Sequence, residues 1–350
     1  MKVACFAPRV GSATGVADYA AALHRELQKH VQLVETGEDL ALYHLGNNPV
    51  HNQIYARALV KPGVILLHDG VLNHFFLGMF DRETYVNEFA HNYGSWTETF
   101  AEQLWNQRAS SATDPRYFAY PMTRRIAEIS RAVLVHNPAA ARSVRAHAPQ
   151  AHTVEVPHFF SLEPGIRPPE PAAHFTVGIF GHLRETKRIH VVIRALERTR
   201  KHGIDARLLL AGAFVSNHLA LALPWQAPWI SHTGALSDAD FWRAAQSVDV
   251  CVNLKYPSAL ETSGIGVQMM GLGKPVIFSQ GAELEHIPET ACLRVACSPD
   301  EEQVLAGYLL WLAQNPKAAR NIGRTAAEYV QREHAIGAIA KKISAVLNAA

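Results

Sequence analysis

The sequence has few cysteines, little net charge and no long hydrophobic run. Its four cysteines show no CxxC or mixed Cys/His spacing, and Cys5 and Cys251 lie inside apolar runs, so we expect reduced, buried thiols. The formal charge is only +2, and the Lys and Arg residues are scattered rather than clustered. These features indicate a cytosolic compartment and argue against a nucleic-acid partner.

Several sequence signatures are also missing. No run reaches the ~18 apolar residues of a membrane-spanning helix, and the N-terminus lacks the basic and apolar regions of a signal peptide. We therefore expect a cytoplasmic protein, with peripheral contact at the inner face of the membrane left open. The GxSxG, HExxH and Walker signatures are missing, and no dinucleotide fingerprint follows the first strand of either half. The sequence thus gives no support for hydride transfer or for a recognisable nucleophile–base pair.

What the chain does contain is an alternation of short apolar runs and helical segments. With 350 residues, 48% of them hydrophobic, it has the size of two globular domains. The alternation indicates parallel βαβ units, whose functional loops lie at the carboxyl ends of the strands. We predict an α/β fold with domains at 1–160 and 174–330. A proline-rich linker at 161–173 joins them, and a last helix within 331–350 can cross back to the first domain.

Each half opens with the same order of elements. A strand at 2–7 leads through a small-residue loop to a helix at 16–30, and a strand at 175–180 leads through a second loop to a helix at 188–202. Further strands are expected at 31–35, 40–44, 63–70, 132–136, 154–157, 206–210, 230–233, 248–254 and 276–279. Further helices are expected within 71–131, after 136–138, and at 237–246, 300–314, 317–330 and 334–347.

One loop-to-helix stretch is the strongest candidate site. Glu261 stands directly before Thr262-Ser263-Gly264, and an apolar helical run follows at 265–272. Free backbone N–H groups at a helix start suit a phosphate, and Glu261 could hold hydroxyls of the molecule that carries it. On this stretch alone, a capped core helix with Glu261 at the surface is an equal alternative.

A second candidate is the loop at 181–188, between the first strand and first helix of the second half. Lys187 and Arg188 lie at its end. Because cations are unfavourable at the positive end of a helix, their presence favours a bound anion over a merely solvated helix start. The loop at 11–15 is rich in glycine, which allows close approach of the backbone to a ligand.

Other polar positions are more ambiguous. Asp238 and Asp240 follow Ser237, and we interpret them as the acidic first turn of a capped helix rather than as metal ligands. His68 and His136 each end a strand on the predicted cleft side. Each is a candidate site residue, with a core or capping role as the alternative.

Taken together, these segments resemble the retaining glycosyltransferases of family 4, which have the GT-B fold of two Rossmann-like domains facing across a cleft. The resemblance covers nearly the whole chain, and is carried by residues 11–19, 181–188, 249–250, 256–264 and 273–276. It implies transfer of a sugar from a nucleotide-diphosphate sugar to an acceptor hydroxyl with retention at the anomeric carbon. It also implies that no metal cofactor is needed, and suggests a role in bacterial polysaccharide or glycoconjugate synthesis.

The resemblance assigns roles to particular residues. Glu261 would bind hydroxyls of the donor sugar, Lys187 would neutralise the phosphates, and His68 would lie near the sugar. The donor-binding residues that it implies are Thr14, Gly15, Gly181, His182, Arg184, Arg188, Gly212, Gly234, Thr262, Ser263, Gly264, Ile265 and Gln268.

Two positions depart from the family pattern. Gln268 stands near the place of a second Glu that binds the ribose hydroxyls, and His182 stands where an Arg is common. An uncharged amide and an imidazole bind their partners less firmly than the usual residues. The departures favour one alternative, a nucleotide-sugar-binding subunit without turnover. The other alternative, a GT-B epimerase of nucleotide sugars, is disfavoured by the sequence from Glu261 to Gly264.

The acceptor should be recognised by the first half of the chain. A carbohydrate, glycolipid or glycoprotein acceptor could stack on its aromatic side chains, although packing of these side chains between helices is at least as good an interpretation. The aromatic residues concerned are Phe75, Phe76, Tyr85, Trp96 and Trp105.

Overall fold

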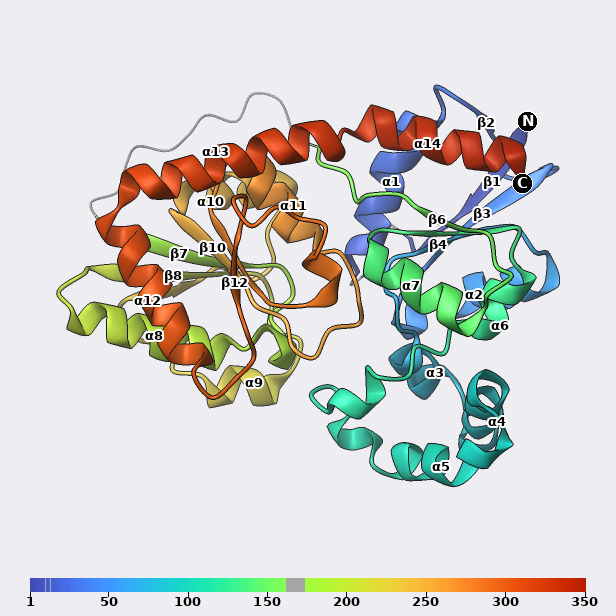
Figure 1. The fold of residues 1–350 in the computed structure, drawn as a ribbon, viewed down its shortest axis with the longest axis horizontal. Coiled ribbons are helices and arrows are strands. Elements are labelled where there is room, and N and C mark those ends of the chain that lie inside the picture. Colours follow the sequence, from blue (N-terminus) through green and yellow to red (C-terminus); the bar gives the residue numbers. More distant parts are fainter. Residues whose placement is uncertain (10, 13, 162–173) are drawn as a thin grey trace.

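The computed structural model describes residues 1–9, 11–12, 14–161 and 174–350. It contains two six-stranded parallel sheets, one in each half of the chain, with helices packed against them (Figure 1). The predicted α/β architecture of two parallel-sheet domains is therefore confirmed. The predicted linker at 161–173 lies, except for its first residue, outside the described residues.

The N-terminal sheet has the strand order β2-β1-β3-β4-β5-β6. Its three central strands are buried along their whole lengths and consist mainly of Val, Leu, Ile and Ala, as is typical of parallel strands with helices on both faces. The strands are β1 (Lys2–Phe6), β2 (Gln32–Leu33), β3 (Leu40–Leu45), β4 (Val64–Leu67), β5 (Ala132–Val135) and β6 (Thr153–Glu155).

Helices surround this sheet, and several of them form an insertion between β4 and β5 that projects below the domain in Figure 1. Phe75, Phe76 and Tyr85 are buried in this region, so their alternative role in packing is the one observed. Trp96, in contrast, is 84% exposed. The helices are α1 (Gly15–Leu27), α2 (Asn52–Val60), α3 (Asn73–Met79), α4 (Arg82–Tyr93), α5 (Glu98–Asn106), α6 (Arg124–Ile129) and α7 (Pro138–His147).

The C-terminal sheet has the strand order β12-β11-β10-β7-β8-β9. Its strands are β7 (Phe175–Phe180), β8 (Ala206–Ala211), β9 (Ile230–His232), β10 (Val250–Asn253), β11 (Val276–Ser279) and β12 (Leu293–Val295). The helices around it are α8 (Ile189–Lys201), α9 (Asn217–Ala222), α10 (Asp238–Ser247), α11 (Gly264–Gly271) and α12 (Glu301–Gln314).

The last two helices run across both domains (Figure 1). After α13 (Pro316–Glu333), α14 (Ile336–Ala349) packs on α1, and its Ile343 and Leu347 are buried in the same apolar cluster as Leu23. Within the described ranges, no helix combines the length and the apolarity that crossing a membrane requires.

Three short elements were not predicted, namely α2, α9 and β12. They have nine, six and three residues, and runs this short carry little periodic signal. The prediction also made β2 longer than it is. The helix expected at 265–272 is confirmed as α11, and it is the one that positions the candidate site.

Candidate functional site

Two loops of the C-terminal domain meet at the carboxyl ends of β7 and β10. The Tyr256 amide donates a hydrogen bond to the Thr186 carbonyl at 2.9 Å. A Cβ atom on Gly181 would lie 3.5 Å from Cγ1 of Ile265, in the first turn of α11. The cationic loop and the start of α11, which are about 80 positions apart in the sequence, are therefore neighbours in space, as functional loops of a parallel sheet are expected to be.

Glycine lets the loops after β7 and β8 approach each other closely. Gly181 has φ +79°, and its amide donates to the Ala211 carbonyl at 2.9 Å. A Cβ atom on Gly212 would lie only 2.0 Å from the Gly181 carbonyl oxygen, so a larger residue there would push the loops apart. The Gly212 carbonyl also accepts a hydrogen bond from His232 at 2.8 Å. Gly234, with φ +72°, has open space around it.

The start of α11 is built to receive an anion. Ser263 caps the helix, and its hydroxyl oxygen accepts from the Gly266 amide at 3.1 Å. The Asn253 side chain, at the end of β10, donates to the same hydroxyl at 2.7 Å. The Gly264 and Ile265 amides of the first turn have no acceptor within the helix, and the helix dipole adds positive charge at this end. Asn253 supports this cap and was not predicted as a site residue.

Positive charge is in surplus beside this helix start. Burial, with the charges of Lys255 and Arg184, lowers the pKa of Lys187 to about 8, although Cys251 acts in the opposite direction. In the part of the chain that the structure describes, the Lys187 ammonium has no ion-pair partner. An ammonium without a counter-charge in a half-buried position is unfavourable, and an anion bound here would relieve this.

Glu261 lies in the same place but is not a free surface residue. Its side chain is 10% exposed and forms an ion pair with the Lys255 ammonium. The other carboxylate oxygen accepts from the Ala259 amide at 2.8 Å and lies 3.4 Å from the Ser258 hydroxyl. The surface alternative for Glu261 is thus wrong. Lys255, six positions earlier in the same loop, is a functional candidate that the sequence did not single out.

Lys255 also connects the two domains electrostatically. Burial lowers its pKa, whereas the negative charge of Asp69 raises it. Asp69 belongs to the N-terminal domain, where it follows β4 and accepts from the Asn47 amide at 2.7 Å. Asp69 directly follows the predicted site residue His68, and this place in the sequence could have identified it as a site residue.

Two predicted donor-binding residues, Arg188 and Gln268, have side chains that contact other parts of the structure. The Arg188 Nε atom lies 2.9 and 2.7 Å from the two carboxylate oxygens of Glu301, which is 2% exposed at the start of α12. Arg188 therefore joins α8 to α12. The Gln268 amide nitrogen lies 3.5 Å from the Phe159 carbonyl oxygen, on the side of α11 that faces the end of the N-terminal domain. Its amide oxygen is buried without a hydrogen-bond partner among the described residues.

The start of α1 borders the site from the N-terminal domain. Thr14 caps this helix through its hydroxyl, which accepts from the Val16 amide at 3.3 Å, and Gly15 is its first residue. Asp18, in the first turn, interacts electrostatically with His182 and Asp238 of the other domain. Burial, followed by Arg184 and Lys187, lowers the pKa of His182, so that its imidazole is neutral near pH 7. Residues 10 and 13 of this loop lie outside the described residues.

A chain of histidine side chains runs through the N-terminal domain at the ends of its central strands. The Nε2 atoms of His24 and His44 are 3.1 Å apart, and Nδ1 of His44 lies 3.0 Å from Nε2 of His68. The chain continues from Nδ1 of His68 to Nε2 of His136 at 3.3 Å, and Nδ1 of His136 lies 3.0 Å from the Val156 carbonyl oxygen.

The terminal carbonyl fixes the direction of this chain. A carbonyl can only accept, so Nδ1 of His136 donates to it, and Nε2 of the neutral ring must accept from His68. The same reasoning makes His68 accept from His44. Burial lowers the pKa of His136 to about 4 and those of His44 and His68 well below the ordinary range, which keeps the rings neutral. Both ring nitrogens of His68 are thereby occupied, and its predicted contact with the sugar remains a prediction.

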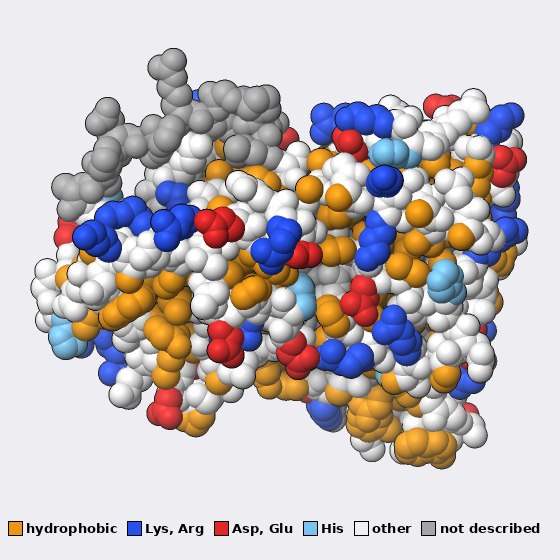
Figure 2. All heavy atoms as spheres, turned by 45° about the horizontal axis from the view of Figure 1, so that its top comes forward, with side chains coloured by type: hydrophobic (Ala, Val, Ile, Leu, Met, Phe, Trp, Pro, Cys, Tyr) orange, Lys and Arg blue, Asp and Glu red, His pale blue; other side chains and the backbone are white. Residues whose placement is uncertain are grey.

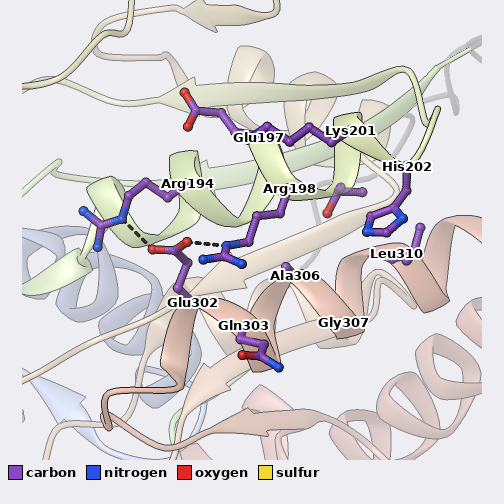
Figure 3. A pocket seen from close by; sticks show the side chains of 11 residues that line it. Arg194, Glu197, Arg198, Lys201, His202, Glu302, Gln303, Ala306, Gly307 and Leu310 are labelled. Carbon is purple, nitrogen blue, oxygen red and sulfur yellow. Dashed lines mark hydrogen bonds and ion pairs between the residues drawn. The ribbon is translucent and has the colours of Figure 1, made fainter.

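A separate surface cavity of about 650 Å³ lies between α8 and α12 (Figure 3). Glu302 forms ion pairs with Arg194 and Arg198 there, and none of the predicted site residues lines the cavity. The face shown in Figure 2 carries interspersed basic and acidic side chains. Within the described ranges, no three His, Cys, Asp or Glu side chains are grouped so that they could hold a metal ion.

Part of this chain resembles a known protein family. Residues 174–315 match the model of the family described as Glycosyl transferases group 1, a stretch that contains both loops of the site. The sequence has no match among curated proteins.

Solved structures resemble the whole chain. Sucrose-phosphate synthase from Thermosynechococcus elongatus is 15% identical with a TM-score of 0.69, and the match covers 100% of this chain and 98% of the synthase. HepE from Anabaena, solved in complex with UDP and glucose, is 14% identical with a TM-score of 0.63, and all of both chains is covered. The pneumococcal O-GlcNAc transferase GtfA, solved with UDP and GlcNAc, is 13% identical with a TM-score of 0.60, and the match covers 95% of this chain and 60% of GtfA. These likenesses confirm the predicted GT-B fold.

Proposed function

We propose that this protein is a glycosyltransferase that moves a sugar from a nucleotide-diphosphate sugar to an acceptor hydroxyl, with retention at the anomeric carbon. The observation that carries the proposal is the meeting of Glu261, the start of α11 and Lys187 in one place. A carboxylate that can hold sugar hydroxyls there adjoins a cationic site that can hold a diphosphate. The match of residues 174–315 to glycosyl transferases group 1 and the UDP-bound structural relatives support this assignment.

The chemistry that these residues can perform is electrostatic. As the glycosidic bond stretches, negative charge accumulates on the departing diphosphate. Lys187 and the amides of the first turn of α11 would stabilise that charge, and so would bind the transition state more tightly than the ground state. Because these groups neutralise the diphosphate, the proposed reaction requires no metal ion.

The rest of the donor has candidate contacts as well. The buried oxygen of the Gln268 amide can accept a hydrogen bond from a ribose hydroxyl, which would satisfy a polar atom that has no partner among the described residues. Gly234 has open space around it, and the backbone there and at Gly212 would border the nucleotide base. The start of α1, at Thr14 and Gly15, can approach the phosphates.

The acceptor belongs to the N-terminal domain in this proposal, and a role in bacterial polysaccharide or glycoconjugate synthesis fits the reaction. Of the five aromatic residues considered for acceptor stacking, Trp96 is the one with a largely exposed side chain. Contact with a glycolipid acceptor at the membrane surface is part of the proposal.

A nucleotide-sugar-binding protein without turnover is the second candidate function. The observation that favours it is the engagement of both ring nitrogens of His68, which leaves that residue no free atom for the sugar. The two candidates differ in what happens to the donor after it binds.

The test begins with a thermal-shift screen of UDP, GDP, ADP and dTDP, since a ligand that binds the native state raises the melting temperature. The purified protein is then incubated with sugars of the selected nucleotide and with candidate acceptors. We expect release of the nucleoside diphosphate and, by NMR, a product with the anomeric configuration of the donor. Saturable binding without release would instead indicate a binding protein, and a changed sugar without an acceptor would indicate an epimerase.

Lys187→Ala tests the proposed role of Lys187 in sugar transfer. It should lower kcat by roughly 10²–10³-fold, as the loss of one oxyanion donor does. Lys201→Ala, which changes an exposed lysine on α8, is the control and should keep the wild-type rate. Transfer at the wild-type rate by Lys187→Ala would show that the proposed role of this residue is wrong.

A further inference from the structure

The loop that carries Glu261 belongs to the C-terminal domain but is anchored on the N-terminal domain. Leu260 packs against the main apolar cluster of the N-terminal domain. A Cβ atom on Gly70, just after β4, would lie 2.8 Å from the Leu260 Cβ atom and 3.4 Å from the Ala259 carbonyl oxygen. The two domains are therefore in direct contact here, without room for a side chain at Gly70.

Hydrogen bonds hold the loop on both sides of Glu261. The Gly70 amide donates to the Ala259 carbonyl at 2.7 Å. The side-chain amide of Asn137 donates to the Leu260 carbonyl at 2.8 Å and to the Thr262 hydroxyl at 3.1 Å. The residues directly before and after Glu261 are thus bound to one side chain of the other domain.

The orientation of Asn137 is determined by its own helix. Asn137 is the N-cap of α7, and its side-chain oxygen accepts from the Ala140 amide at 2.9 Å. Since the oxygen is used by the cap, the NH₂ group must point away from α7, toward the loop. The side chain is buried, so both groups would be costly to leave unpaired.

The loop has a conformation that needs this support. Leu260 has φ +57°, a left-handed conformation that is unfavourable for a residue with a Cβ atom. Such a conformation persists only where surrounding contacts hold it. One such contact is local, from the Leu260 amide to the Ser258 hydroxyl at 3.1 Å. The others come from Asn137, Gly70 and the apolar cluster of the opposite domain.

We propose that Asn137 and Gly70 form an interdomain latch that fixes the backbone on both sides of Glu261 only while the two domains are closed. Asn137 is then a positioning residue, acting on the sugar through Glu261. This inference rests on the proposed function, because Glu261 is assigned to the donor sugar there. The charged and N–H groups that would hold the diphosphate, Lys187 and the start of α11, lie in the C-terminal domain, and Thr14 and Gly15 approach it from the other domain. The latch should therefore affect sugar transfer much more than nucleotide binding.

Asn137→Asp tests the latch directly. The aspartate keeps an oxygen that can cap α7 but loses the NH₂ group that reaches the loop. We expect kcat for sugar transfer to fall at least roughly tenfold, while the Kd for the free nucleoside diphosphate stays within about twofold of wild type. Equal loss of nucleoside diphosphate affinity and of kcat would indicate a general structural defect and overturn the latch.

Gly70→Ala is the second variant. It leaves the Asn137 cap of α7 unchanged, although its methyl group would also lie 3.2 Å from the Ala140 Cβ atom of that helix. Its methyl group would collide with Leu260 and separate the domains, so it should reproduce the loss of kcat. Small-angle X-ray scattering of the ligand-free proteins gives a readout that needs no activity. Both variants should have a larger radius of gyration than wild type, and an unchanged radius with an unchanged kcat would overturn the latch.

The two proposals can fail separately. If wild-type protein released no nucleoside diphosphate with any donor, the proposed function would fail, while the scattering comparison would still decide whether the latch holds the domains together. If wild-type protein transferred sugar and both variants did so at the same rate, the latch would fail and the proposed function would stand.

Discussion

Lys187 and Arg188 are adjacent in the sequence, yet the structure gives them different environments. Lys187 is half-buried among other cations, whereas Arg188 is bound by the buried carboxylate of Glu301. A carboxylate that satisfies one cation leaves the other available for a ligand. Each residue therefore makes its own prediction.

The pKa of Lys187 predicts how nucleotide affinity depends on pH. In the free protein this pKa is about 8, and a bound diphosphate raises it because negative charge favours the ammonium. Binding therefore takes up a proton above pH 8. Affinity for the nucleoside diphosphate should be constant below this pH and fall above it, by at most about tenfold per pH unit.

Titration calorimetry between about pH 7 and about pH 9, in buffers of different ionisation enthalpy, measures both the affinity and the proton uptake. Lys187→Ala should bind more weakly and lose most of the pH dependence. Wild-type affinity that stays constant over this range would contradict the assignment of Lys187 to the diphosphate.

Arg188 predicts a change in stability rather than in binding. Arg188→Met leaves the carboxylate of Glu301 buried without its partner, which should lower the free energy of unfolding by about 3–5 kcal/mol. Urea denaturation measures this loss. Arg194→Met breaks a more exposed ion pair on the same helix and should cost at most about 1 kcal/mol. A stable Arg188→Met protein with weakened nucleotide affinity would instead place Arg188 in the donor site.

At the scale of elements, the carboxyl ends of neighbouring parallel strands bring side chains together. His44 lies one residue before the end of β3, and His68 and His136 directly follow β4 and β5. The adjacent parallel strands place these side chains within hydrogen-bonding distance of one another. The chain of neutral rings is a packed polar network inside the N-terminal domain. Its hydrogen bonds are consistent with one tautomer at each ring, so protonation of any ring must disrupt it.

This histidine chain predicts that acid destabilises the fold. Burial lowers the pKa of His24 and of His136 to about 4, whereas unfolded histidine has a pKa near 6.5. The unfolded state therefore binds protons first. The stability that the neutral rings provide is complete above about pH 6.5 and decreases as the pH falls toward about 4.

Urea denaturation at a series of pH values from about 7.5 to about 5 measures this dependence. The free energy of unfolding should fall with pH, with a smaller slope in His24→Gln, which removes one ring from the outer end of the chain. His218→Gln, at an exposed position on α9, is the control variant. Equal stability at both ends of the pH range would mean that the buried rings do not control acid sensitivity.

At the scale of the whole molecule, the chain crosses between the domains more than once. The last helix, α14, packs on α1 and shares the apolar cluster of the N-terminal domain. The loop of Glu261 is hydrogen-bonded to Gly70 and Asn137 of the same domain. Each domain therefore depends on residues that are far away in the sequence. The arrangement lets closure of the domains control both the site and the stability of the N-terminal half.

Ile343 tests the contribution of α14. Its side chain is fully buried against the N-terminal core, so Ile343→Ala should lower the free energy of unfolding by about 2–5 kcal/mol. Lys342→Ala changes the exposed neighbour on the same helix and should have little effect. If both variants unfolded at the same urea concentration as wild type, α14 would not be part of the core.

Local patterns were enough to predict much of this protein. The alternation of strands and helices, the small residues around Gly181 and the cap before α11 could all be interpreted in the sequence, because each depends on residues within a few positions. Glu261 and Lys187 were predicted to lie in one cleft for the same reason, since both follow strands of one parallel sheet.

The partners of individual side chains were decided by the tertiary structure. Arg188 meets Glu301, which is 113 positions away, and Asn137 meets Leu260, which is 123 positions away. Nothing in the neighbouring sequence indicates such pairs, because strand order and domain closure determine which loops meet. The sequence by itself determined the two sheets and the chemical groups of the site. Only the folded chain decided which cations remain free for an anion, and that the loop of Glu261 is held by the opposite domain.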